Sequence, residues 1–199
     1  AHDAVAHFEN LELNQEKEGL DIPEIYYAVY QNIIAISLFN HEAHLFSHVY
    51  KEQHNIETIE QLLEAKNSTR FSFEKVGGKT SNLTDAEYLK FVDQGKQHCF
   101  RGDVFQLVLS RRFSQKFKGD EFNVYRTLRS INPSPYLFFF DYGDFKIFGS
   151  SPEAQIIVEE GKAEIHPIAG TFKRTGNDEQ DKQAALELAK DPKENSEHV

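Results

Sequence analysis

Residues 132–169 read NPSPYLFFFDYGDFKIFGSSPEAQIIVEEGKAEIHPIA, and this stretch carries the clearest pattern of secondary structure in the chain. It contains three or four short runs rich in aromatic and β-branched residues, a composition typical of β-strands. Tight turns at Gly143 and Gly161 separate neighbouring runs. Links this short join antiparallel neighbours, because a parallel pair needs a crossover of a dozen or more residues. The stretch therefore predicts antiparallel strands over 136–142, 145–150, 154–160 and 163–169.

Helical signals lie on both sides of these strands. Thr84-Asp85-Ala86-Glu87 has the pattern of a capping box and predicts a helix that ends near Gly102. A second helix is predicted over 120–131, where Asn132-Pro133 stops it. Near the end of the chain, Asp191-Pro192-Lys193-Glu194 places a cap, a proline and a glutamate where a further helix starts. The sequence thus predicts an α+β fold, with antiparallel sheets and packed helices.

The first 80 residues are less regular. Two strand-like runs at 33–39 and 45–50 flank a polar turn and predict a hairpin. Helical spacing follows over 56–65, and the polar stretch 71–84 predicts a connecting loop. A further strand is predicted over 104–110, where apolar residues alternate.

Composition excludes some classes of protein. The net charge of −10 over 199 residues disfavours nucleic acid and anionic membranes as partners, because both require a basic surface. No apolar run approaches the ~20 residues of a membrane-spanning helix. Cys99 is the only cysteine, so an intrachain disulfide cannot form, which fits a reducing cytoplasm. Cys99 falls on the apolar face of its predicted helix, which favours a buried thiol.

Several polar residues are candidates for chemistry, although each alone has an ordinary structural explanation. Gln106 lies midway along an apolar strand, where a polar group must find a partner or line a cavity. Glu194 and Glu197 lie three apart and share one face of the predicted helix. His41, His44 and His48 cluster near the predicted hairpin turn. Their spacing is not that of a metalloprotease helix, so solvated turn histidines are the better interpretation.

Taken together, the motifs resemble one family, the chorismate-binding enzymes. The resemblance is carried, in order and spacing, by GDVFQLVLSRRF at 102–113, NPSPYLFFFD at 132–141, GSSPE at 149–153, HPIAGTFKR at 166–174 and DPKENSEH at 191–198. It covers 81–199 strongly and 1–80 weakly. The resemblance implies that 81–199 are the first part of the catalytic domain of the chorismate-utilising enzyme fold. Residues 1–80 would then be the end of the N-terminal region.

Two positions distinguish the reactions of this family. Relatives that use water carry a Lys where this chain has Gln106, and aminodeoxychorismate synthases typically carry a Lys where it has Ala169. The resemblance therefore favours the branch that uses ammonia, in which chorismate is converted to anthranilate and pyruvate. An aminodeoxychorismate synthase without the lysine stays an alternative. A non-catalytic fragment that binds tryptophan or a partner subunit is another.

The resemblance also implies residue roles. Glu153 matches the general acid that protonates the leaving hydroxyl, a role for which its pKa should be raised. Mg²⁺, held by carboxylate oxygens, would neutralise the dianionic substrate. The matched positions are Glu153 and Gln106 for catalysis, Gly170 and Thr171 for substrate, Glu197 and Glu194 for the metal, and Pro135, Tyr136 and Leu137 for tryptophan as feedback inhibitor.

Partners follow from the resemblance alone. Such enzymes usually receive ammonia from a glutamine amidotransferase subunit in a hetero-oligomer. The chain has no initiator Met and stops within a predicted helix, so we expect an internal piece truncated at both ends. The remaining site residues would lie beyond Val199. We expect the isolated piece to be inactive and to expose apolar surface.

Overall fold

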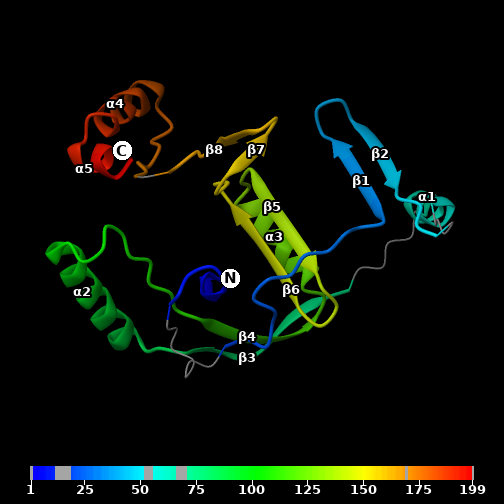
Figure 1. The fold of residues 1–199 in the computed structure, drawn as a ribbon, viewed down its shortest axis with the longest axis horizontal. Helices are drawn as coiled ribbons and strands as arrows, with labels where there is room; N and C mark the ends of the chain where they lie inside the picture. Colours follow the sequence, from blue (N-terminus) through cyan, green and yellow to red (C-terminus); the bar gives the residue numbers. More distant parts are fainter. Residues whose placement is uncertain (1, 12–18, 52–55, 66–70, 169, 199) are drawn as a thin grey trace. The chain divides into compact units, whose positions relative to one another are not determined.

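The computed structural model describes residues 2–11, 19–51, 56–65, 71–168 and 170–198 (Figure 1). The chain divides into two compact units, Ala1–Arg70 and Phe71–Val199. Helices alternate with short antiparallel two-stranded sheets, which confirms the predicted α+β class. In the described part of the chain, no helix is long and apolar enough to cross a bilayer. The domain boundary expected between residues 80 and 81 stays a prediction.

The first unit contains the predicted hairpin and helix. After a short 3₁₀ helix at His2–His7, strands β1 (Asn32–Ser37) and β2 (Glu42–Ser47) pair antiparallel. Helix α1 spans Ile56–Glu64. His41 lies in the hairpin turn with a positive φ of 58°, a backbone conformation that favours polar turn residues. Both predicted elements are confirmed.

The second unit opens with a strand that the sequence interpretation missed. Strand β3 (Phe73–Ser81) pairs antiparallel with β4 (Phe113–Gly119), so the connecting loop predicted over 71–84 is wrong. The register shifts between Val76 and Thr80, so Gly77 and Gly78 lie within a bulge. A bulge interrupts the alternation of side chains that identifies a strand.

The strand predicted over 104–110 is also wrong, because this extended segment lies outside every ladder that the structure describes. Its alternation serves packing against helix α2 (Asp85–Arg101). A Cβ atom on Gly95 would lie 2.9 Å from Leu107 Cδ2 and 3.6 Å from Leu109 Cδ1. The two leucines therefore project together onto α2, and the absence of a side chain on Gly95 lets them approach.

Cys99 lies on the same side of α2. It lines a groove with Tyr88, Val92 and the two leucines, Leu107 and Leu109. The thiol is exposed, because the groove is open to solvent, so the prediction of a buried thiol is wrong.

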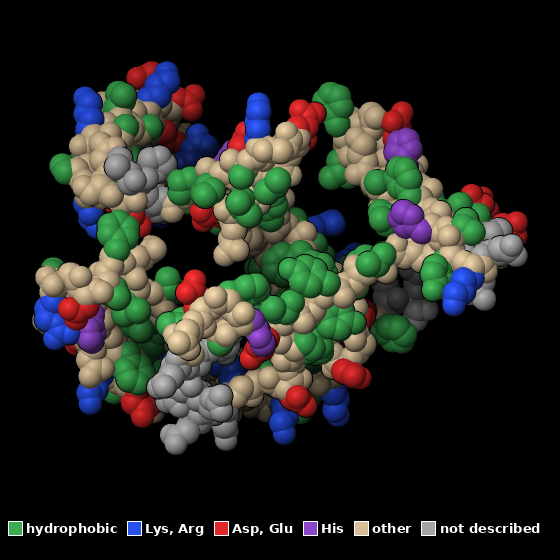
Figure 2. Space-filling model, in the orientation of Figure 1, with side chains coloured by type: hydrophobic (Ala, Val, Ile, Leu, Met, Phe, Trp, Pro, Cys, Tyr) green, Lys and Arg blue, Asp and Glu red, His purple; other side chains and the backbone are tan. Residues whose placement is uncertain are grey.

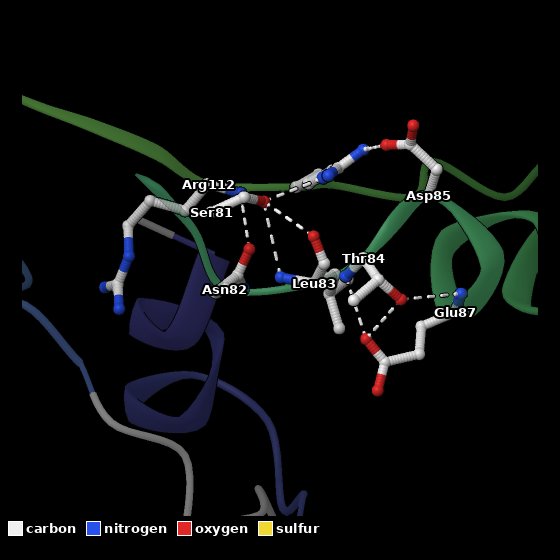
Figure 3. A network of polar contacts seen from close by, with 8 residues as sticks. Ser81, Asn82, Leu83, Thr84, Asp85, Glu87 and Arg112 are labelled. Atoms are coloured by element: carbon white, nitrogen blue, oxygen red, sulfur yellow. Dashed lines mark hydrogen bonds and ion pairs between the residues drawn. The ribbon is translucent and has the colours of Figure 1, made fainter. Parts of the chain in front are cut away.

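A network of polar contacts joins the end of β3, the start of α2 and the start of β4 (Figure 3). Arg111 donates from Nε to Ser81 Oγ at 2.8 Å and from Nη1 to Asp85 Oδ1 at 2.6 Å. The Arg112 amide donates to Asn82 Oδ1 at 2.9 Å. Because both arginines immediately precede β4, the network anchors the segment that carries Leu107 and Leu109 at its C-terminal end.

The predicted capping box is confirmed at the start of α2. The Glu87 amide donates to Thr84 Oγ1 at 3.3 Å, and the Thr84 amide donates to Glu87 Oε2 at 2.8 Å (Figure 3). These bonds from the Thr84 amide and hydroxyl hold the pKa of Glu87 below its ordinary value. Gly102 ends the helix in the left-handed conformation, with φ of 78°.

Replacing Thr84 with Ala should lower the free energy of unfolding of the full-length protein by about 1 kcal/mol, because the Glu87 amide loses its acceptor, Thr84 Oγ1. Denaturant unfolding followed by circular dichroism measures the change. Thr127→Ala is the matched control. Its hydroxyl bonds to the Asn123 carbonyl within helix α3 (Phe122–Ile131), so its loss removes no cap. Equal destabilisation by both variants would contradict the capping role.

The strands predicted over 136–169 and the last helix are present in the second unit, but β7 and β8 are shorter than predicted. The four strands occur, although they form two separate hairpins of two strands each. The elements are β5 (Tyr136–Asp141), β6 (Lys146–Ser151), β7 (Ile157–Glu159), β8 (Lys162–Glu164), α4 (Asp178–Leu188) and α5 (Pro192–His198).

Helix α3 lies along the β5–β6 hairpin (Figure 1), and an aromatic cluster packs the two together. Phe122 meets Phe139 edge to face with ring centroids 5.0 Å apart, and Phe139 stacks on Phe148 at 5.5 Å. Such aromatic pairs favour offset or edge-to-face geometry. Lys146 on β6 forms an ion pair with Glu121, just before α3, and lowers the pKa of that carboxyl. Strand β6 is thereby held where it leads into the GSSPE motif.

Burial within the units is shallow. Among the described residues, Ala4 is the only buried apolar side chain, and no large side chain is fully buried. Figure 2 shows apolar side chains at the surface of the β1–β2 hairpin and of the second unit. This agrees with the expectation that the isolated chain exposes apolar surface.

Candidate functional site

Helix α5 presents two carboxylates on one face. Asp191 caps the helix, because its Oδ1 accepts the amides of Lys193 at 2.8 Å and Glu194 at 3.1 Å. The cap sets the first turn, so Glu194 and Glu197, three residues apart, lie side by side. Both side chains are half-buried. The cap predicted from the sequence is confirmed here and positions both residues.

The Glu194 carboxylate lies directly against Gly170. A Cβ atom on Gly170 would lie 1.8 Å from Glu194 Oε2, so only glycine leaves room for the carboxylate there. The Glu194 side chain is 17% exposed, and its Oε1 lies 3.8 Å from Lys193 Nζ. Its Oε2 is buried and has no hydrogen-bond partner among the described residues. A buried carboxylate oxygen normally has a partner, so this oxygen is available to a ligand.

Gln106 contacts the second carboxylate. Its Nε2 lies 3.5 Å from Glu197 Oε1, across 91 positions of sequence. At this distance the hydrogen bond is a long one. The contact nevertheless shows that the segment after α2 and helix α5 meet at these two predicted residues.

Glu153 is joined to the segment that leads to Gly170. The Ile168 amide donates to Glu153 Oε1 at 3.3 Å, two residues before Gly170. At the end of β6, Ser151 Oγ donates to the Glu153 carbonyl at 3.0 Å and accepts the Glu153 amide at 3.4 Å, which forms a tight turn. The Glu153 side chain is exposed, as is that of Thr171. A solvent-accessible carboxyl of this kind can exchange a proton with a bound molecule.

The three residues predicted for tryptophan lie at the start of β5. Tyr136 pairs with Ser151 and Leu137 with Ser150 in the β5–β6 register, and Pro135 immediately precedes the strand. The Ser150 hydroxyl donates to the Asn132 carbonyl at 2.5 Å and ties the NPSP turn to β6. These three residues belong to the β5–β6 hairpin. The other predicted site residues contact one another separately, Gln106 with Glu197 and Gly170 with Glu194.

The residues present fit a divalent cation in part. In the described ranges, no group of three or more His, Cys, Asp or Glu side chains is placed to hold a metal ion. Mg²⁺, however, is commonly held by one or two carboxylates together with water and substrate oxygens. Glu194, with its unpaired buried oxygen, and Glu197 are the carboxylates that would supply such a pair. His41, His44 and His48 are exposed, as expected of solvated histidines.

One residue near the site was not singled out from the sequence. Asp181 on α4 accepts hydrogen bonds from the amide and hydroxyl of Thr175, four residues after Thr171. The only available signal was an aspartate in the first turn of a helix that follows Thr-Gly-Asn. The discriminating position Ala169 lies outside the described residues.

The chain is similar to a known family of proteins over its whole length. A family model described as chorismate binding enzyme matches residues 1–199. Anthranilate synthase component 1 of Aquifex aeolicus (strain VF5) is 46% identical over 119 residues, which are 60% of this chain and 24% of that protein. Anthranilate synthase component 1 of Acetivibrio thermocellus is 32% identical over an alignment of 216 residues, which covers all of this chain and 44% of that protein.

A solved structure agrees with these relatives. The crystal structure of anthranilate synthase component I from Streptococcus pneumoniae TIGR4 matches with a TM-score of 0.75 and 28% sequence identity. The match covers 99% of this chain and 45% of that one. The chain therefore spans less than half the length of these relatives.

Proposed function

Because this chain belongs to the chorismate-binding enzyme family, we propose that it is part of an anthranilate synthase component I. In this role the full-length protein would convert chorismate and ammonia to anthranilate and pyruvate. The relatives described above carry that name. The chain has Gln106 where water-using relatives carry a lysine, and Ala169 where aminodeoxychorismate synthases carry one. An aminodeoxychorismate synthase is the less favoured alternative.

One observation carries the proposal: residues far apart in sequence meet at the predicted substrate and metal positions. Gln106 contacts Glu197, and Glu194 fills the space that Gly170 leaves open. Packing of a carboxylate against a glycine Cα stabilises little by itself. An unpaired buried oxygen at the same point is costly unless a ligand uses it. The arrangement therefore supports binding of a charged molecule.

In the proposed reaction, Glu153 donates a proton to the ring hydroxyl as ammonia adds to chorismate. Its carboxyl is exposed, and the Ile168 amide orients it toward the segment that contains Gly170 and Thr171. The Thr171 hydroxyl, also exposed, would hydrogen-bond a substrate oxygen. Elimination of pyruvate then gives the aromatic amine.

Glu194 and Glu197 are the residues of this chain that would hold Mg²⁺. When bound, the ion would neutralise carboxylate charge on the substrate. The unpaired Glu194 oxygen supports this assignment, and Gln106 would orient Glu197 through its long hydrogen bond. Further ligands would come from water, from substrate or from the rest of the protein.

Partners and regulation are part of the same proposal. The relatives are named as a component 1, which supports a second subunit, and we propose a glutamine amidotransferase that supplies ammonia within a hetero-oligomer. Tryptophan, the feedback inhibitor, would contact Pro135, Tyr136 and Leu137. A biosynthetic enzyme of this kind would act in the cytoplasm.

The direct test gives the full-length protein chorismate, Mg²⁺ and an ammonium salt and identifies the product by fluorescence and mass. Anthranilate with released pyruvate, suppressed by added tryptophan, is the expected result. Aminodeoxychorismate without pyruvate would assign the protein to the other branch. Tryptophan binding without any turnover would favour the non-catalytic alternative.

A further inference from the structure

The segment that follows Gly170 lies beside carboxylates from two different helices, and one of them, Asp181, is hydrogen-bonded to it. We infer that Asp181, on α4, is a positioning residue that sets the place of Thr171 for the substrate. Asp181 would act through Thr175 and the intervening backbone and would not itself touch substrate. This inference rests on the proposed function, because Thr171 is a substrate-binding residue only within it.

The C-terminal end of the segment is fixed by Asp181. Its Oδ1 accepts the Thr175 amide at 2.7 Å and the Thr175 hydroxyl at 2.8 Å, and its Oδ2 accepts Arg174 Nε at 3.3 Å. The Asp181 side chain is only 12% exposed, whereas that of Arg174 is 85% exposed. A solvent-exposed guanidinium adds little to such a pair, so the two bonds from Thr175 provide most of the anchoring.

Asp181 itself is rigidly placed. Asn177 caps α4, because its Oδ1 accepts the amides of Glu179 and Gln180, each at 3.1 Å. The Thr175 amide, then its hydroxyl, and then Arg174 hold the pKa of Asp181 below its ordinary value. The carboxyl is therefore ionised at neutral pH, when an anion accepts hydrogen bonds more strongly than a neutral acid.

At the N-terminal end of the segment, the Glu194 carboxylate occupies the space beside Gly170 and limits how far this end can move toward α5. Between Gly170 and Thr175, Phe172 lines a groove along α4 with Ala184, Ala185 and Leu188. Thr171 lies between Gly170 and Phe172 and keeps an exposed side chain. The Thr175–Asp181 bonds therefore fix the backbone four residues after Thr171, whose hydroxyl makes no hydrogen bond that the described part of the chain shows.

A purely structural role for Asp181 makes a different prediction. If Asp181 only stabilised the start of α4, its loss would lower the unfolding temperature and leave the chorismate affinity of the folded protein unchanged. If it positions Thr171, its loss weakens chorismate binding. It would then raise KM more than it lowers kcat, since a contact made equally in the ground and transition states acts on KM.

The test compares Asp181→Ala and Asp181→Asn in the full-length protein, with Asp178→Ala as the matched control from the same helical turn. Chorismate binding is measured by calorimetry in the presence of Mg²⁺, and KM and kcat by anthranilate formation. Asp181→Ala should weaken binding and raise KM by about tenfold, the loss expected for hydrogen bonds to a charged group. Asp181→Asn keeps an oxygen that accepts from Thr175 and should stay within about threefold of the wild type.

Hydrogen–deuterium exchange provides a readout that needs no activity. In Asp181→Ala, peptides spanning 171–176 should exchange faster, while peptides from α5 stay unchanged. A wild type that binds chorismate without forming anthranilate would refute the proposed function, and weaker binding by Asp181→Ala would still support positioning. Equal chorismate affinity of the wild type and Asp181→Ala, or equal losses in Asp181→Ala and Asp178→Ala, would overturn the inference.

Discussion

Replacing Glu153 with Gln in the full-length protein should lower kcat for anthranilate formation by about 10²–10⁴-fold, the usual contribution of a general acid. Glutamine has nearly the same shape as glutamate, and its carbonyl can still accept the Ile168 amide, so the segment toward Gly170 keeps its anchor. The amide cannot supply the proton that the leaving hydroxyl requires. KM for chorismate should therefore change by no more than about threefold.

Steady-state kinetics with ammonium as the nitrogen source measure this effect without dependence on a partner subunit. Glu159→Gln, on the exposed edge strand β7, makes the same chemical change away from the site and should retain wild-type kcat. Wild-type kcat in Glu153→Gln would rule out the proposed general acid. A large rise in KM alone would instead assign Glu153 to substrate binding.

Replacing Gly119 with Ala should destabilise the full-length protein by about 2–5 kcal/mol, through backbone strain and steric overlap together. Gly119 ends β4 with φ of 96°, and a Cβ atom there would lie 1.7 Å from the Ser72 carbonyl oxygen. Because the obstacle is backbone and not a mobile side chain, Phe73 and Gly119 could no longer pair at the end of the β3–β4 ladder.

Gly143→Ala separates the two causes of this loss. Gly143 also has a positive φ, of 86°, but a Cβ atom there meets no atom within 4 Å. Gly143→Ala should therefore lower the free energy of unfolding by about 1–2 kcal/mol, from backbone conformation alone. Denaturant unfolding of the two variants measures the difference, and equal losses would show that the contact with Ser72 is not what limits β4.

Local signals in the sequence predicted most of the elements. The β5–β6 hairpin, the capping box at Thr84 and the Asp191 cap each depend on residues within a few positions of one another. Strand β3 could not be identified in this way, because Gly77 and Gly78 interrupt its alternation and its partner is β4, beyond helix α2. Segment 104–110 was wrongly predicted as a strand because it alternates like one. Its alternating leucines pack on Gly95 and join no ladder that the structure describes.

The candidate site shows the same division. The identities of Glu153, Glu194 and Glu197 followed from motifs, and their roles stay predictions. The contact of Glu194 with Gly170 and the bond of Asp181 to Thr175 could not be predicted from spacing, because each depends on how α4 and α5 fold back on the preceding segment. Tertiary packing, which no local pattern records, decides these contacts.

The 91-residue separation of Gln106 and Glu197 also bears on protein synthesis. A nascent chain emerges from the ribosome N-terminus first, so Gln106 and then Gly170 are made before either α5 glutamate exists. Closing so long a loop costs entropy that local hairpins do not incur. The hairpins and α2 can therefore form during translation, whereas the carboxylate pair reaches its partners only after α5 has left the exit tunnel. Chains that end before Pro192 would therefore have formed strands but would lack both of the glutamates proposed to hold the cation.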